Sequence, residues 1–116
     1  MPRPTLNASL LFAASLMTAS AAGAADPARP QITISDHRFT PAELHVPANQ
    51  PLVIDVHNQD PTAEEFESAD MGVEKVIAGG RALPVRIRPL APGRYTFIGE
   101  YHAETATGVI IADGEK

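Results

Sequence analysis

The chain has 116 residues, and its 14 Asp and Glu residues outnumber 9 Lys and Arg residues, which gives a formal net charge of −5 at pH 7. This acidic balance disfavours nucleic acid and anionic membrane surfaces as partners. Cysteine is absent, which excludes a disulfide framework and any thiolate chemistry. The length is sufficient for one small domain, whose stability must come from a packed core.

The N-terminus has the features of an export signal. Arg3 precedes an uncharged, apolar stretch over residues 8–17, and the small residues Ala22, Gly23 and Ala24 follow it. The apolar stretch is shorter than the roughly 20 residues that a membrane-spanning helix needs. We therefore predict a signal peptide over residues 1–24 with cleavage near 24/25, a short segment 25–30, a single domain over 31–116, and a periplasmic location.

The rest of the chain has the pattern of short strands separated by turns. Residues 31–34, 44–46, 52–56 and 83–88 alternate or form compact apolar runs, and Pro, Gly and Asn punctuate the gaps at intervals of about 8 to 12 residues. An amphipathic helix of ordinary length is not recognisable, although residues 68–76 leave room for a helical turn. This pattern predicts an all-β, antiparallel Greek-key β-sandwich. We interpret Gly79-Gly80-Arg81 as a hairpin turn.

The run from Pro92 to His102 contains a second signal for a Greek-key fold. It begins with Pro-Gly, continues as a Tyr-x-Phe strand, and is followed by an apolar strand over residues 108–111. Tyr95 lies two residues past Gly93, where it can form a tyrosine corner.

Residues 64–67, Glu-Glu-Phe-Glu, place three carboxylates around one aromatic residue. On a strand, alternation puts Glu64 and Phe66 on the inward face and Glu65 and Glu67 on the other. A bulge between residues 63 and 66 would reverse this assignment. Three such carboxylates repel one another unless a cation is near, so they are candidate metal ligands; a solvated strand face is the alternative.

Several motifs together resemble the cupredoxins. They are the run Phe-Thr-Pro-Ala-Glu-Leu-His-Val-Pro-Ala over residues 39–48, Asn58 before the first ligand loop, and the closing hairpin over residues 93–108. More narrowly, residues 36–39, residues 57–60 with 64–68, and residues 99–102 resemble the cupredoxin-like periplasmic component of bacterial iron-permease uptake systems. The resemblance implies a cupredoxin-type β-sandwich, copper binding, and action on ferrous iron, with an inner-membrane iron permease and other periplasmic iron-uptake components as partners.

The resemblance also locates a ligand set. Glu64 falls where the first histidine ligand of a blue copper site would lie, Gly99 falls on the cysteine, His102 matches the second histidine, and the axial methionine falls near Thr105. Without a thiolate, bound copper would be non-blue. Imidazole and carboxylate donors suit Cu(II), Fe(II) or Mn(II) better than Cu(I). The resemblance implies iron as the substrate or second metal.

The four histidines differ in their expected roles. His102 lies in the ligand loop, His37 lies at the end of the first strand beside that loop, His57 is expected to be structural, and His45 is expected to face water. The predicted metal ligands are therefore His37, Glu64, Glu67 and His102. Outer candidates are Glu65, Asp70, Met71 and Glu100.

Two functions remain open from the sequence. In the first, the protein is a metal-binding redox protein that oxidises Fe(II), or passes electrons and iron to a permease. In the second, it is a redox-silent carrier of copper or iron, or an adaptor module. A paired-carboxylate hydrolase is disfavoured, because so small a sandwich has little room for a substrate cleft. We expect a monomer or a weak dimer.

Overall fold

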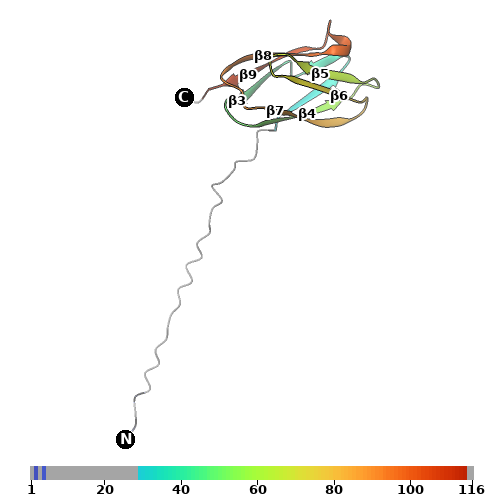
Figure 1. Cartoon of the computed structure of the whole chain (residues 1–116). Coiled ribbons are helices and arrows are strands. Elements are labelled where there is room, and N and C mark those ends of the chain that lie inside the picture. The colour runs from blue at the N-terminus through green and yellow to red at the C-terminus, as the bar shows by residue number, and fades with distance from the viewer. Residues whose placement is uncertain (1, 3, 5–28, 115–116) are drawn as a thin grey trace.

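The computed structural model describes residues 2, 4 and 29–114. Most of the predicted signal peptide and of the segment 25–30 lies outside these residues, so both stay predictions. The described part forms two packed sheets (Figure 1), which confirms the predicted all-β sandwich. Its elements are β1 (Gln31–Ser35), β2 (Arg38–Thr40), β3 (Glu43–Pro47), β4 (Leu52–Asn58), β5 (Glu64–Ser68), β6 (Val73–Ile77), β7 (Ala82–Ile87), β8 (Gly93–Gly99), the 3-10 helix η1 (Glu100–His102) and β9 (Thr107–Asp113).

Within residues 29–114, none of the helical segments is both long enough and apolar enough to cross a bilayer.

The strand order is β2-β1-β4-β7 in one sheet and β3-β9-β8-β5-β6 in the other. Two neighbouring pairs, β1 with β4 and β3 with β9, run parallel. The expected antiparallel pairing holds for the other neighbouring strands and not for these two pairs. The alternation of apolar residues reports which face of a strand is buried, and it carries no information about the direction of the neighbouring strand.

The core beneath the candidate ligand loops is aromatic. Phe39 comes from β2, whereas Phe66 and Phe97 come from the opposite sheet, and all three are buried. The ring of Phe97 lies 4.9 Å from that of Phe39 and 4.9 Å from that of Phe66. Aromatic pairs at such distances contribute about 0.5–1.5 kcal/mol each beyond the area they bury. These rings tie the two sheets together.

Two turns differ from the sequence prediction. Residues 68–76 do not contain a helical turn: they form the β5–β6 turn and most of strand β6, with Gly72 at a φ of 68°. The Met71 N–H donates to Ser68 Oγ at 3.1 Å, and this hydroxyl donates to the Thr96 carbonyl at 2.7 Å. Gly79-Gly80-Arg81 is not a hairpin turn either, because it joins β6 of the larger sheet to β7 of the smaller one.

The tyrosine corner is confirmed. Tyr95 Oη donates a hydrogen bond of 2.7 Å to the carbonyl of Ala91, four residues upstream. This bond fixes the connection that leads into β8, the strand that precedes η1.

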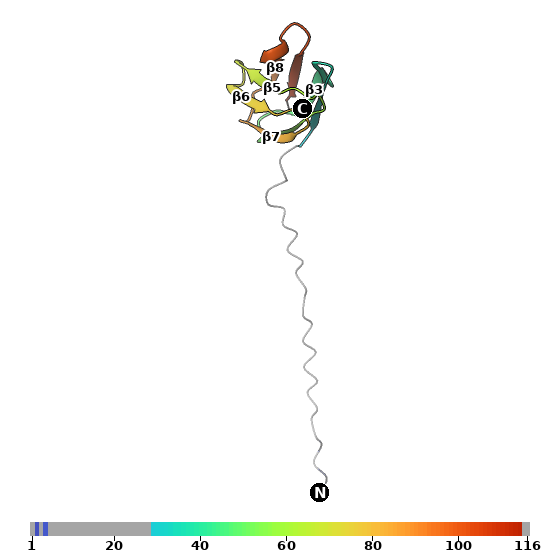
Figure 2. The ribbon, with the colours of Figure 1, turned by 90° about the vertical axis from the view of Figure 1, so that its right-hand side faces the viewer.

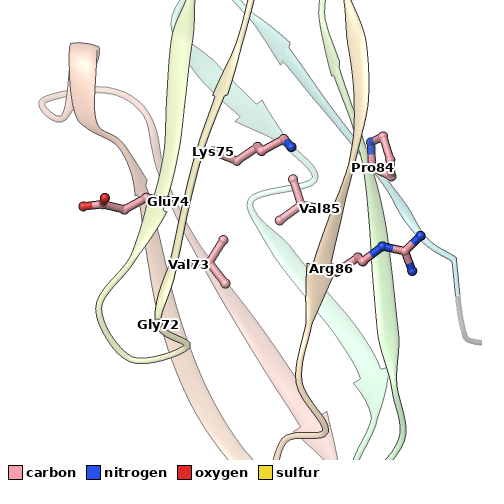
Figure 3. A pocket seen from close by; sticks show the side chains of 7 residues that line it. All are labelled: Gly72, Val73, Glu74, Lys75, Pro84, Val85 and Arg86. Atoms are coloured by element: carbon pink, nitrogen blue, oxygen red, sulfur yellow. The ribbon is translucent and has the colours of Figure 1, made fainter.

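One side of the sandwich is open. Strands β6 and β7 end the two sheets on this side, and a groove of about 370 Å³ lies between them (Figure 3). Figure 3 shows Lys75 extending from β6 into the gap and Glu74 pointing the other way. Val73, Pro84, Val85 and Arg86 are among the residues that line it, and the predicted metal ligands are not.

Candidate functional site

Three of the four predicted ligands meet at one end of the sandwich. His37 lies in the turn between β1 and β2, Glu64 begins β5, and His102 ends η1. η1 and the loop that follows it project from the top of the molecule in Figure 2. The structure thus brings together residues from three separate segments, as the sequence predicted.

Glu64 is a buried carboxyl group that contacts three nitrogen atoms. It is 1% exposed, and Phe66 is fully buried beside it, whereas Glu65 and Glu67 are partly exposed, so the predicted strand alternation is confirmed. Its Oε1 accepts from the backbone N–H of Tyr101 at 2.9 Å and of Glu65 at 3.1 Å. Its Oε2 lies 2.5 Å from His102 Nδ1. Burial of a carboxylate is costly unless it is paired and hydrogen-bonded, and these contacts meet that requirement.

The two histidines stack on one another. The ring centroids of His37 and His102 lie 3.5 Å apart with an interplanar angle of 11°. His37 reaches this position from a two-residue turn in which Asp36 and His37 have φ angles of 53° and 56°. Such turns favour Asn-Gly or Asp-Gly, since non-glycine residues rarely adopt positive φ.

Asp60 holds this turn, and the sequence interpretation did not single it out. The side chain accepts from the backbone N–H groups of Asp36 at 2.8 Å and His37 at 3.0 Å. The hydrogen bond from His37 is the main cause that lowers the pKa of Asp60, and burial acts in the opposite direction. The Asp60 N–H donates in turn to Asn58 Oδ1 at 3.0 Å. The spacing Asn-x-Asp is the sequence signal for such a local bond.

Thr105 holds the same turn from the other side. Its Oγ1 donates to the His37 carbonyl at 2.6 Å. The residue that falls near the axial methionine in the resemblance therefore fixes the backbone of His37.

Gly99 shows why a thiolate site does not fit this chain. Its backbone is ordinary extended structure, with a φ of −91° and a ψ of 104°. A Cβ atom built there would lie 2.6 Å from Glu64 Cδ and 2.6 Å from the Ala106 Cβ. The Glu64 carboxyl group fills the space beside Gly99 in which a larger side chain would have to sit. The donor types present, imidazole and carboxyl group, are those of nitrogen and oxygen metal sites and not of copper-thiolate sites.

Glu67 is not brought to the other three predicted ligands. It lies on the opposite face of β5 and pairs across the strands with Glu74. A side-chain hydrogen bond with Glu100, desolvation, and repulsion from the neighbouring carboxylates raise the pKa of Glu67 to about 7. We call Glu65, Glu67, Glu74 and Glu100 the acidic patch. Across residues 29–114, no three His, Asp or Glu side chains are arranged so that they could hold a metal ion together.

The remaining candidates have other surroundings. His45 is exposed, as predicted, with Nδ1 3.0 Å from Asp113 Oδ2. Met71 is 2% exposed and packs in the core, as the packing alternative predicted. Asp70 accepts from the Thr96 N–H at 2.9 Å. Asp70 and Met71 follow the C-terminal end of β5. At 3.3 Å per residue, that end of the strand lies about 13 Å from Glu64.

A hollow of about 490 Å³ opens beside the stacked rings. His37, Tyr101, His102, Ala103, Glu104 and Thr105 line it. It is large enough for water or a hydrated cation. The imidazoles have access to solvent through this hollow, whereas the carboxyl group of Glu64 is buried.

Two packed sheets, a tyrosine corner and a histidine-bearing loop before the last strand define a β-sandwich of cupredoxin type. The family model of the Cupredoxin-like domain matches residues 8–112, and the chain belongs to this family.

Other comparisons agree with this fold. The chain is 40% identical over 83 residues to the uncharacterized protein RP394 of Rickettsia prowazekii (strain Madrid E); the match covers 72% of this chain and 66% of that protein, just under two thirds of its length. Auracyanin A, described as a "blue" copper protein from Chloroflexus aurantiacus, superposes with a TM-score of 0.64 at 16% identity, over 76% of this chain and 100% of auracyanin A. Amicyanin from Paracoccus versutus gives 0.58 at 15% identity, over 80% and 87%. A purple cupredoxin from Nitrosopumilus maritimus gives 0.56 at 14% identity, over 72% and 99%.

Proposed function

We propose that this protein binds one divalent metal ion, Cu(II) in preference to Fe(II), at the cluster of His37, Glu64 and His102, and that it serves ferrous-iron uptake. The observation that carries the proposal is the juxtaposition of two imidazoles and one buried carboxyl group at the end of a cupredoxin-type sandwich. No three such groups of residues 29–114 surround one point, so binding an ion requires these side chains to reorient. Imidazole-rich sites bind Cu(II) more tightly than the other divalent first-row metals. When bound, copper would supply a one-electron acceptor.

The surroundings of the cluster support a cationic substrate, and the choice of iron rests on the sequence resemblance. The acidic patch lies on the adjoining outer face of β5 and β6, and Glu104 lines the hollow. Carboxylates of this kind raise the local concentration of cations. The periplasmic location and the iron permease as partner rest on the export signal and on the sequence resemblance, and both belong to the proposal.

A metal titration tests the binding site. We expect the chain from residue 25 onward to bind about one Cu(II), with weak d-d absorption and an EPR spectrum of nitrogen and oxygen ligation. His102→Ala should weaken binding by roughly tenfold or more, because it removes an imidazole donor. His45→Ala is the matched control, since His45 is exposed and distant in the fold, and it should bind as the parent does. An intense blue band would contradict the ligand set.

A second candidate function is a redox-silent metal carrier or an adaptor. It is favoured by the carboxyl group of Glu64, which is fully hydrogen-bonded by protein groups, and by the tight packing around Gly99. Following Fe(II) after air is admitted, with and without one equivalent of Cu(II), separates the two. Faster Fe(II) loss with the copper-loaded parent than with the copper-loaded His102→Ala variant supports the redox function. Equal rates support the carrier.

A further inference from the structure

We propose that the open side of the sandwich is a docking site for an extended segment of a partner protein, which adds as a strand to the free edge of β6 and carries a carboxylate opposite Lys75. The proposal goes beyond the proposed metal binding and does not depend on it, because the predicted metal ligands do not line this groove. The partner segment is recognised by its backbone and by the order of its apolar and charged side chains.

The first argument is the free backbone edge of β6. Strand β6 pairs with β5 on one side, and it ends the larger sheet on the other. Its five residues include no proline, so the N–H and C=O groups along the free edge can pair with a further strand. Across the groove, Pro84 interrupts the row of N–H donors on β7. Strand β6 is therefore the better template of the two.

The second argument is the position of Lys75. It extends into the groove (Figure 3), and the residue paired with it on β5 is Phe66 and not a carboxylate. None of the ion pairs formed among residues 29–114 includes Lys75. Opposite charges directly across two strands stabilise their pairing. A carboxylate at the facing position of an added strand would therefore give this ammonium group a partner in an otherwise acidic chain.

The third argument is the alternation along β6, which sets the rest of the pattern. Val73 and Ile77 lie on the same face of the strand as Lys75. Glu74 and Val76 lie on the other face, where Val76 is 47% exposed. A strand added antiparallel, which is the commoner arrangement, would meet Ile77 first and Val73 last. The matching segment therefore reads apolar, apolar, acidic, basic, apolar.

The groove suits the side chains of such a segment. Its volume of about 370 Å³ is near the lower end of the range for ligand pockets, which is about 300–1,000 Å³. The apolar residues Val73, Pro84 and Val85 line it beside Lys75. A space of this size accepts a few side chains and not a folded domain. An extended segment is therefore the occupant that fits.

The test uses two acetylated and amidated pentapeptides of one composition. The matched peptide, Thr-Val-Glu-Lys-Val, places its Glu opposite Lys75 and its Lys opposite Glu74. In the exchanged peptide, Thr-Val-Lys-Glu-Val, the two charges are swapped. Each is titrated into the ¹⁵N-labelled protein and followed by ¹H–¹⁵N correlation NMR. The matched peptide should shift the amide signals of residues 73–77 and bind roughly tenfold more tightly than the exchanged one, because opposite-charge pairs replace like-charge pairs.

Charge reversal at Lys75 tests the same contact from the protein side. Lys75→Glu should lose roughly tenfold in affinity for the matched peptide and should instead prefer Thr-Val-Lys-Lys-Val. Arg94→Glu is the matched control: it makes the same change of charge at an exposed position of β8, and it should bind as the parent does. Circular dichroism checks the fold of each variant.

Three results would overturn the proposal. The first is the absence of binding by both peptides, or equal affinity for the two. The second is a set of shifts confined to residues outside β6. The third is a concentration-dependent shift of the β6 signals in the peptide-free parent, because the occupant would then be a second copy of this chain.

Discussion

The close approach of Gly99 to Glu64 predicts that Gly99→Ala destabilises the fold. The backbone of Gly99 is one that alanine adopts freely, so the cost is purely steric. The new methyl group would lie 2.6 Å from both Glu64 Cδ and Ala106 Cβ. Overpacking of this kind costs about 1–3 kcal/mol of folding stability. Alanine also restricts the unfolded chain more than glycine does, which offsets about 0.4–1 kcal/mol of this cost. We expect a net loss of about 1–2 kcal/mol in the free energy of unfolding.

Urea unfolding followed by circular dichroism measures this loss, and a double-mutant cycle assigns it. Gly99→Ala should cost less in a Glu64→Ala background, by about 0.5 kcal/mol or more, because one of the two clashing groups is gone. Gly114→Ala is the control: the nearest atom to its new methyl group would be Pro92 Cγ at 3.1 Å, and we expect little effect. An unchanged stability of Gly99→Ala, or an equal cost in both backgrounds, would refute the steric reasoning.

Two further predictions concern His37 and Glu67. His37→Gly should leave the urea midpoint unchanged or raise it, because a positive φ costs a non-glycine residue about 1–2 kcal/mol. Its Cu(II) affinity should fall by roughly tenfold or more, measured in the same titration as for His102→Ala. A large loss of stability would show that the His37 ring is needed for folding. The pKa of Glu67 is raised from 4.5 to about 7, so its contribution to stability is full below pH 4.5 and is lost as the pH rises through about 7. Glu67→Gln should therefore flatten the dependence of the urea midpoint on pH over this window, and an unchanged slope would contradict the assignment.

Local pattern predicted the strands well and their partners poorly. The alternation over residues 31–34 and 83–88 corresponds to β1 and β7, and the tyrosine corner formed as expected. Strand β6 was missed because Val73-Glu74-Lys75-Val76-Ile77 is exposed at three of its five positions and lacks a regular apolar face. Gly79 and Gly80 correctly marked a turn, but a turn signal does not show whether the next strand joins the same sheet.

The site was predictable as a set of residues and not as a set of contacts. Alternation placed Glu64 inward, and the resemblance placed it near His102. The hydrogen bond from the Asp36 N–H to the Asp60 side chain joins residues 24 positions apart, and sequence spacing alone cannot reveal such a bond. The packing of Gly99 against Glu64 is likewise visible only when β5 and β8 are paired.

The open side of the sandwich has a consequence for solubility. Free strand edges such as those of β6 and β7 are templates for intermolecular pairing, which leads to aggregation. Pro84 leaves a gap in the row of N–H donors along β7, as prolines in edge strands do, and Lys75 places a charge in the groove beside β6 (Figure 3). An antiparallel pairing of β6 with a copy of itself centred on Lys75 would set two ammonium groups against each other. Pro84 and Lys75 therefore both disfavour intermolecular strand pairing between copies of this chain along this side of the sandwich.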